Sequence, residues 1–124
     1  MATSKHFSDA ELRCKHCGKN EMDEEFLEYL EKVREELGVP LFVTSGYRCP
    51  EHNIAVSNSG AHGPHTTGKA VDIMISGKRA YKLVNVALGL GFTGIGVAQK
   101  GNFGGRFIHL DMLEGDLRPR IWSY

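Results

Sequence analysis

The spacing of hydrophobic residues predicts two helices and a strand in the first part of the chain. Residues 7–13 contain Ser8-Asp9-Ala10-Glu11, which fits a capping box and predicts a helical turn. A longer helix is predicted after Asp23, because apolar residues recur there at helical intervals until Gly38 and Pro40 end the pattern. These apolar positions are Phe26, Leu27, Leu30, Val33 and Leu37. The β-rich run 41–44 then predicts a buried strand.

The second part of the chain alternates between loops and short regular elements. Residues 51–56 predict a short helix, and residues 57–68 predict a long loop of small and polar residues that carries two histidines. A strand at 70–75 is followed by a helix that opens at Gly77 and ends at 89–91. Strands are also predicted at 94–98 and 106–112, with a glycine-rich connection between them. The hairpin-like connection favours an α+β fold, in which helices flank a small antiparallel sheet, over a doubly wound sheet.

Length and charge narrow the classes of function. The chain has 124 residues with 15 basic and 15 acidic side chains, so we expect one domain over residues 1–124. The balanced charge and the absence of a Lys/Arg cluster argue against a nucleic-acid partner. No apolar run reaches the roughly 18 residues of a membrane span, and residues 1–20 do not resemble a signal peptide. We therefore expect a monomer that is made in the cytoplasm and has no membrane partner.

The three cysteines form an uneven set. Cys14 and Cys17 have the spacing of half a zinc knuckle, and Cys49 and His16 are the obvious further ligands for a four-coordinate structural site. An odd number of thiols cannot all pair within one chain. A partly buried set of thiols, or a disulfide from Cys49 to one of the pair, is the favoured interpretation, and the structural zinc site is the alternative.

The six histidines are the unusual feature of the composition, and they point to a metal site. His62 and His65 lie in the polar loop, whereas Asp72 and His109 interrupt strands that otherwise look buried. A buried polar group is costly without a partner, and one metal ion would satisfy both strand residues together. Two imidazoles and a carboxylate are a familiar zinc set, which leaves a position for a water with a pKa near ~7. The chemistry predicted is hydrolysis.

Four segments resemble one family in the same order along the chain. Residues 63–72, with His65, Gly68, Ala70 and Asp72, resemble the Ser-x-His-x-x-Gly-x-Ala-x-Asp signature of the zinc D-alanyl-D-alanine carboxypeptidases. That family includes phage endolysins and vancomycin-resistance D,D-peptidases. Residues 45–48 resemble its Ser-Gly-Tyr-Arg segment, and residues 107–111 resemble its Phe-Val-His-x-Asp segment. The opening residues 6–18 are similar to those of its small phage-type members.

The resemblance implies a fold, a cofactor and an activity. It implies a hedgehog/D,D-peptidase-like domain in which His65, Asp72 and His109 bind one catalytic Zn²⁺, and Arg48 contacts the substrate and stabilises the oxyanion. The expected activity is hydrolysis of peptidoglycan stem peptides or cross-links, with D,D-carboxypeptidase or D,D-endopeptidase favoured. The alternatives are an L-alanyl-D-glutamate endopeptidase of the endolysin type and a zinc-containing wall-binding module without catalysis. A phage-type lysin would reach the wall through a membrane lesion made by another protein.

The sequence departs from the family pattern at two positions. Gly63 replaces the first Ser of the signature, and Arg106 stands where two branches of the family carry an acidic general base three residues before the last ligand. Asp111 is the replacement candidate, because side chains two apart in a strand point to the same side and Asp111 would share the face of His109. It could accept the proton of the nucleophilic water or only orient a ligand. His62 is the next candidate base.

Overall fold

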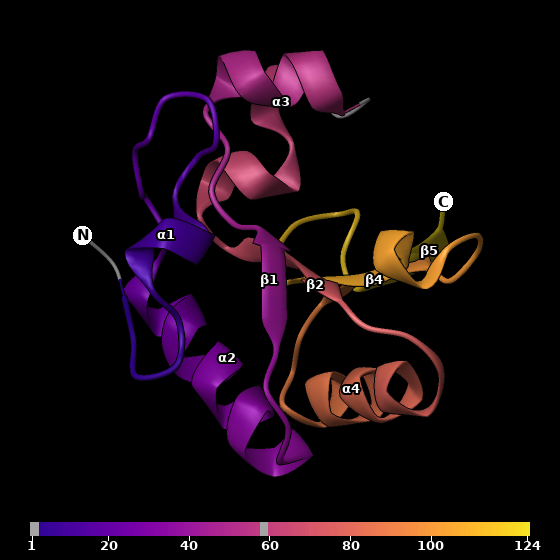
Figure 1. The fold of residues 1–124 in the computed structure, drawn as a ribbon. Coiled ribbons are helices and arrows are strands. Elements are labelled where there is room, and N and C mark those ends of the chain that lie inside the picture. The colour runs from indigo at the N-terminus through magenta and orange to yellow at the C-terminus, as the bar shows by residue number, and fades with distance from the viewer. Residues whose placement is uncertain (1–2, 58–59) are drawn as a thin grey trace.

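The strands form one sheet whose two faces have different characters. The computed structural model describes residues 3–57 and 60–124, and within these ranges five strands follow the order β1-β2-β4-β3-β5 (Figure 1). Pairing is antiparallel except between β3 and β5, which run parallel. The strands are β1 (Phe42–Ser45), β2 (Ala70–Met74), β3 (Gly94–Ala98), β4 (Phe107–Asp111) and β5 (Arg120–Ser123).

Helices cover both sides of this sheet. The α-helices are α1 (Asp9–Leu12), α2 (Glu24–Leu37), α3 (Pro50–Val56) and α4 (Gly77–Gly89), and three 3-10 turns lie at η1 (Gly60–His62), η2 (Pro64–Thr67) and η3 (Phe103–Gly105). In Figure 1, α4 lies below the strands and α3 lies above them. The predicted α+β fold with a small, mostly antiparallel sheet is confirmed.

Side-chain alternation along β2 and β4 separates the core from the polar face. Val71 and Ile73 in β2, and Ile108 and Leu110 in β4, are almost wholly buried in the hydrophobic core with residues of α2 and α4. The residues between them point to the opposite face, because successive side chains of a strand alternate. Burial of each large aliphatic side chain contributes about 1.5–3 kcal/mol. The core side therefore holds the strands in register while the opposite face carries the polar residues.

The long helix α2 begins and ends at the residues that the sequence predicts. The Asp23 carboxylate accepts the N–H of Phe26 at 2.9 Å, and Gly38 closes the helix in the left-handed conformation with φ of 74°. The predicted helix at 51–56 is also confirmed as α3, in which Pro50 occupies the first turn.

Gly68 joins the histidine loop to β2 at a place where another residue would not fit. Its φ is +76°, and a Cβ would meet the backbone oxygen of Glu21. The Gly68 carbonyl accepts the N–H of Asp23 at 2.9 Å, so the loop is tied to the start of α2. Thus the bend expected between His65 and Asp72 is present.

Three parts of the structure differ from the predicted elements. The strand predicted to be buried at 41–44 is the edge strand β1, in which Phe42 and Thr44 are exposed. The loop 57–68 contains the turns η1 and η2 among its described residues, and the C-terminal strand β5 was not predicted. Most side chains of β5 are exposed, and its sequence does not alternate between apolar and polar residues. The strand is held in place by its backbone pairing with β3. Among the described residues, we find no helix with both the length and the apolar character that crossing a bilayer requires.

Candidate metal centre

Three side chains from separate elements converge on the polar face of the sheet. Nε2 of His65, from η2, lies 3.2 Å from Oδ1 of Asp72 in β2, and Nδ1 of His109 in β4 lies 3.1 Å from the same oxygen. All three residues are buried, with exposed fractions of 4%, 8% and 2%. Their potential ligand atoms lie within 4.8 Å of one another. The register of the sheet explains part of this arrangement, because Asp72 is directly opposite His109 in the β2–β4 ladder.

The remaining nitrogen of each imidazole is engaged elsewhere. Nδ1 of His65 lies 2.8 Å from the carbonyl oxygen of Gly46, which can only accept, so this nitrogen donates. Nε2 of His109 lies 2.7 Å from a carboxylate oxygen of Asp111 and donates to it in the same way. In the neutral state, both histidines then direct a lone pair toward the Asp72 carboxylate. A divalent cation resolves this repulsion, so the donor set fits zinc.

The charge state of the group follows from these contacts. Burial disfavours the Asp72 carboxylate, but His109 and His65, when protonated on both ring nitrogens, donate hydrogen bonds to it that outweigh burial and hold the pKa of Asp72 well below its usual range. Burial also opposes a charge on His109, yet its hydrogen bonds to Asp111 and Asp72 raise the pKa of its imidazole. Protons and a metal ion therefore compete for the same nitrogen of His109.

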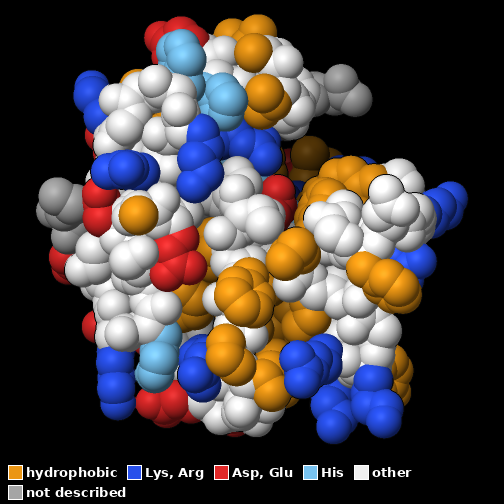
Figure 2. All heavy atoms as spheres, in the orientation of Figure 1, with side chains coloured by type: hydrophobic (Ala, Val, Ile, Leu, Met, Phe, Trp, Pro, Cys, Tyr) orange, Lys and Arg blue, Asp and Glu red, His pale blue; other side chains and the backbone are white. Residues whose placement is uncertain are grey.

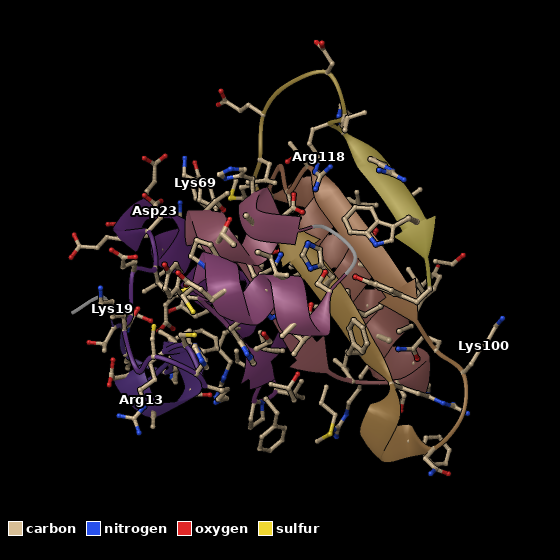
Figure 3. All side chains as sticks on the ribbon, turned by 90° about the horizontal axis from the view of Figure 1, so that it is seen from above. Arg13, Lys19, Asp23, Lys69, Lys100 and Arg118 are labelled. Carbon is tan, nitrogen blue, oxygen red and sulfur yellow. The ribbon has the colours of Figure 1, made fainter. Side chains whose placement is uncertain are left out.

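Asp111 lies behind His109 and is fixed by an arginine. Its side chain is fully buried, and Arg118 donates to both of its oxygens at 3.0 and 2.8 Å. Burial would raise the pKa of Asp111, but the hydrogen bonds from His109 and Arg118 lower it to about 2. The side chain presses against the Cα of Gly94, where a Cβ would overlap the carboxylate. Figure 3 shows Arg118 where the loop before β5 meets the sheet.

Arg48 approaches the same group from the segment after β1. Its Nη2 lies 3.4 Å from Oδ2 of Asp72, which leaves the guanidinium beside the three converging side chains. Nε donates to Ser45 and Nη1 donates to Asn53, each at 3.1 Å. The arginine is thus positioned by three partners, one of which is in the candidate metal centre.

A cavity of about 730 Å³ opens above these residues. Asp72, His65 and His109 lie in its wall together with Arg48, and Figure 2 shows the surface hollowed beneath α3. The other walls come from the end of α3, the turns η1 and η2, the loop between β4 and β5, and β5 with the residue after it; they include Val56, His62, Pro64, Glu114, Leu117, Trp122 and Tyr124. The volume is in the range of pockets that bind small ligands and short peptide segments.

The remaining residues singled out from the sequence fall at several places. His62 lies in the cavity wall, whereas Arg106 donates to the Gly101 carbonyl and packs over the ring of Phe103. His6 lies outside the cavity wall, 2.6 Å from Glu31, and Tyr47 is buried in the core. Arg106, which stands where two branches of the resembling family carry an acidic residue, therefore directs its guanidinium to Gly101 and Phe103 and not to the metal centre.

Sequence reasoning missed three contributors to the site. Arg118 holds Asp111, Trp122 packs its ring against His109 with centroids 5.1 Å apart, and Tyr124 lines the cavity. All three belong to the C-terminal segment that was not assigned to an element. An arginine and two aromatic residues near the end of a chain carry no spacing signal, so the sequence offered no motif from which to find them.

The comparison with known families agrees with this geometry. Residues 5–111 match the peptidase M15 family, which covers the cysteine loop, Arg48 and all three converging side chains. The chain belongs to the peptidase M15 family. M15 enzymes are zinc-dependent peptidases, and the His65–Asp72–His109 group could bind such an ion. No curated protein matches the chain.

Proposed function

We propose that this M15 peptidase hydrolyses peptide bonds in the stem peptides or cross-links of bacterial peptidoglycan, as a D,D-carboxypeptidase or D,D-endopeptidase. The observation that carries the proposal is the convergence of His65, Asp72 and His109 in the wall of a cavity that also holds Arg48. A further support is the resemblance of residues 45–48, 63–72 and 107–111 to D-alanyl-D-alanine carboxypeptidases. On this proposal the protein acts in the cell wall.

The three converging residues hold the cofactor. Zinc bound to His65 Nε2, Asp72 and His109 Nδ1 would polarise the scissile carbonyl and bring the pKa of a coordinated water to about 7. The chain itself supplies the orientation of these ligands. Gly46 and Asp111 each accept a hydrogen bond from the far nitrogen of one imidazole, which selects the tautomer that faces Asp72.

Arg48 binds the charged part of the substrate. Its guanidinium lies 3.4 Å from Asp72, and Ser45 and Asn53 keep it directed toward the cavity. A fixed guanidinium can pair with the terminal carboxylate of a D-alanyl peptide or oppose the charge that develops on the carbonyl oxygen. The first role favours a substrate that ends in a carboxylate near the scissile bond, which is the feature of a carboxypeptidase substrate, whereas the second role would serve any peptide bond.

Asp111 positions a ligand, and His62 carries protons. Asp111 is fully buried, is paired with Arg118, and contacts the nitrogen of His109 that points away from Asp72. These contacts support the orienting role over the role of general base. His62 is exposed in the cavity wall, and histidine is the side chain that most often serves as a general acid or base.

Digestion of purified peptidoglycan, followed by mass analysis of the fragments, tests the bond that is cleaved. The proposal predicts release of free D-alanine or cleavage of D-alanyl cross-links. Cleavage between L-alanine and D-glutamate would instead identify an endopeptidase of the endolysin type, and it would overturn the favoured specificity. The digest is run with zinc and with chelator, so that a contaminating hydrolase that needs no metal is recognised.

A wall-binding module without catalysis is the second candidate, and one observation favours it. Arg106 occupies the position of the acidic base in two branches of the resembling family, and its side chain lies over Phe103. A module of this kind would bind zinc and sediment with peptidoglycan but release no fragment. Turnover of any muropeptide by the zinc-loaded protein would eliminate this candidate.

A further inference from the structure

The three cysteines gather at a second place, which shares no residue with the candidate metal centre. Cys14 and Cys17 lie in the loop after α1, and Cys49 caps the N-terminus of α3. Their sulfur atoms lie within 4.8 Å of one another, although Cys49 is 35 residues from Cys14 in the sequence. All three are free thiols, and Cys14 and Cys49 are buried. The fold therefore brings together three soft ligands of the kind that zinc prefers.

Backbone donors surround the sulfur of Cys14. The N–H of Cys49 donates to it at 3.3 Å, and the N–H groups of His16 and Cys17 also point to it. The loop closes through a hydrogen bond from the Gly18 N–H to the Cys14 carbonyl at 3.0 Å, and Gly18 has a φ of +75°. Such a tight, N–H-rich loop orients both thiols of the pair toward one point.

One imidazole lies beside a sulfur atom of this group, and a second imidazole stacks on the first. Nδ1 of His16 lies 3.4 Å from Sγ of Cys49, and the His16 ring stacks on that of His52 with centroids 5.8 Å apart and planes 4° apart. In a tetrahedral zinc site with usual bond lengths, a nitrogen and a sulfur ligand lie about 3.5 Å apart. The sequence shows the same spacing in both segments: two residues separate Cys14 from Cys17, and two residues separate Cys49 from His52. A nitrogen donor thus lies next to one of the three sulfur atoms.

We propose that Cys14, Cys17 and Cys49 bind a structural Zn²⁺ ion, with one imidazole of the His16–His52 pair as the fourth ligand. Three thiolates and one imidazole are a usual ligand set of closed structural zinc sites. The ion would join the loop after α1 to the start of α3, directly beside Arg48. The same region is held by a hydrogen bond from the Tyr47 N–H to the Leu12 carbonyl at 2.8 Å. Zinc at the cysteines would therefore stabilise the segment that positions Arg48.

The zinc content of the full chain, purified without a His tag or chelator, separates this site from the catalytic one. The wild type is expected to hold two equivalents, and Asp72→Ala is expected to keep one. Replacement of that ion by cobalt in Asp72→Ala should give the intense near-ultraviolet absorption of thiolate-to-cobalt charge transfer. The His65–Asp72–His109 group contains no sulfur and cannot produce this signal. Less than about a tenth of an equivalent in Asp72→Ala, together with no charge-transfer absorption, would overturn the proposal.

Variants of the cysteine group test which residues bind the zinc, and titration of the wild-type thiols with a mercurial reagent tests the same point without mutation. In the Asp72→Ala background, Cys17→Ser and the double variant His16→Ala/His52→Ala should each bind zinc at least about tenfold more weakly. Lys15→Ala, in the same loop, is the control and should bind zinc with unchanged affinity. Should a cysteine variant fail to fold, a mercurial reagent added to the wild type should release one zinc as three thiols react. Reaction of all thiols without zinc release, or a disulfide in protein purified under reducing conditions, would contradict the site.

Discussion

Replacement of Asp111 by asparagine separates the orienting role of this residue from the role of general base. Asparagine has nearly the same shape but no charge, so it removes the carboxylate that pairs with His109 and Arg118. The ordinary pKa of an Asp carboxyl, 3.8, falls to about 2 at Asp111. This difference corresponds to about 2 kcal/mol of stability at neutral pH, which the Asp111→Asn variant should lose.

Three measurements follow from this substitution. Urea unfolding of the zinc-free protein should show the loss of about 2 kcal/mol. The zinc affinity, measured by competition with a chelator, should fall about 10–100-fold because His109 is no longer held in one tautomer. At saturating zinc, kcat should remain within about tenfold of the wild type. Glu114→Gln is the matched control, since Glu114 is a carboxylate in the cavity wall that is exposed to solvent.

The pH dependence of stability provides a second view of the same group. A carboxylate with a lowered pKa in the folded state stabilises the fold above its unfolded pKa, near 4, and this contribution is lost as the pH falls toward 2. The wild type should therefore lose about 2 kcal/mol more than Asp111→Asn over that interval. Unchanged zinc affinity in Asp111→Asn, with kcat reduced about 1000-fold at saturating zinc, would refute the orienting role and identify Asp111 as the base.

The remaining predictions concern three other residues of the site. Arg48→Lys keeps the charge but loses the planar guanidinium that can form two parallel hydrogen bonds. We expect kcat/KM on a D-alanyl peptide to fall about 100-fold at unchanged zinc content. A kcat/KM equal to that of the wild type would exclude the carboxylate-binding role. His62→Ala should lower kcat about 100-fold without a change in zinc affinity. A kcat equal to the wild type, or a greater loss in Glu114→Gln, would assign proton transfer to another residue. Gly94→Ala places a methyl group against the carboxylate of Asp111 and should cost about 1–3 kcal/mol in urea unfolding, whereas wild-type stability would show that the Asp111 side chain can move aside.

The sequence predicts the helices and the central strands well because their signals are local. The stripe of apolar residues in α2 lies between a capping Asp23 and a terminating Gly38, and each of these features acts within one or two turns. The convergence of His65, Asp72 and His109 was also predictable. Asp72 and His109 occupy the same face of adjacent strands, and two polar residues in buried strands need a common partner.

The contacts that complete the site depend on distant parts of the chain. Arg118 reaches Asp111 from the loop before β5, and Trp122 reaches His109 from a strand without an alternating pattern. The approach of Cys49 to Cys14 likewise results from the packing of α3 against the loop after α1. Local propensity contains no information on such pairings, because they are determined by where the sheet places each element. The sequence leaves two roles open for Asp111, the orientation of a ligand and the acceptance of a proton, and the Asp111→Asn measurements distinguish them.

Restoration of peptide hydrolysis by zinc tests the central claim most directly. The protein is stripped with chelator, and hydrolysis of a muropeptide that ends in D-alanyl-D-alanine is followed as zinc is added back to the wild type and to Asp72→Ala. We predict no hydrolysis by the stripped protein, recovery in the wild type and no recovery in Asp72→Ala. Equal hydrolysis with and without zinc, or recovery in Asp72→Ala, would contradict the assignment of His65, Asp72 and His109 to a catalytic zinc site.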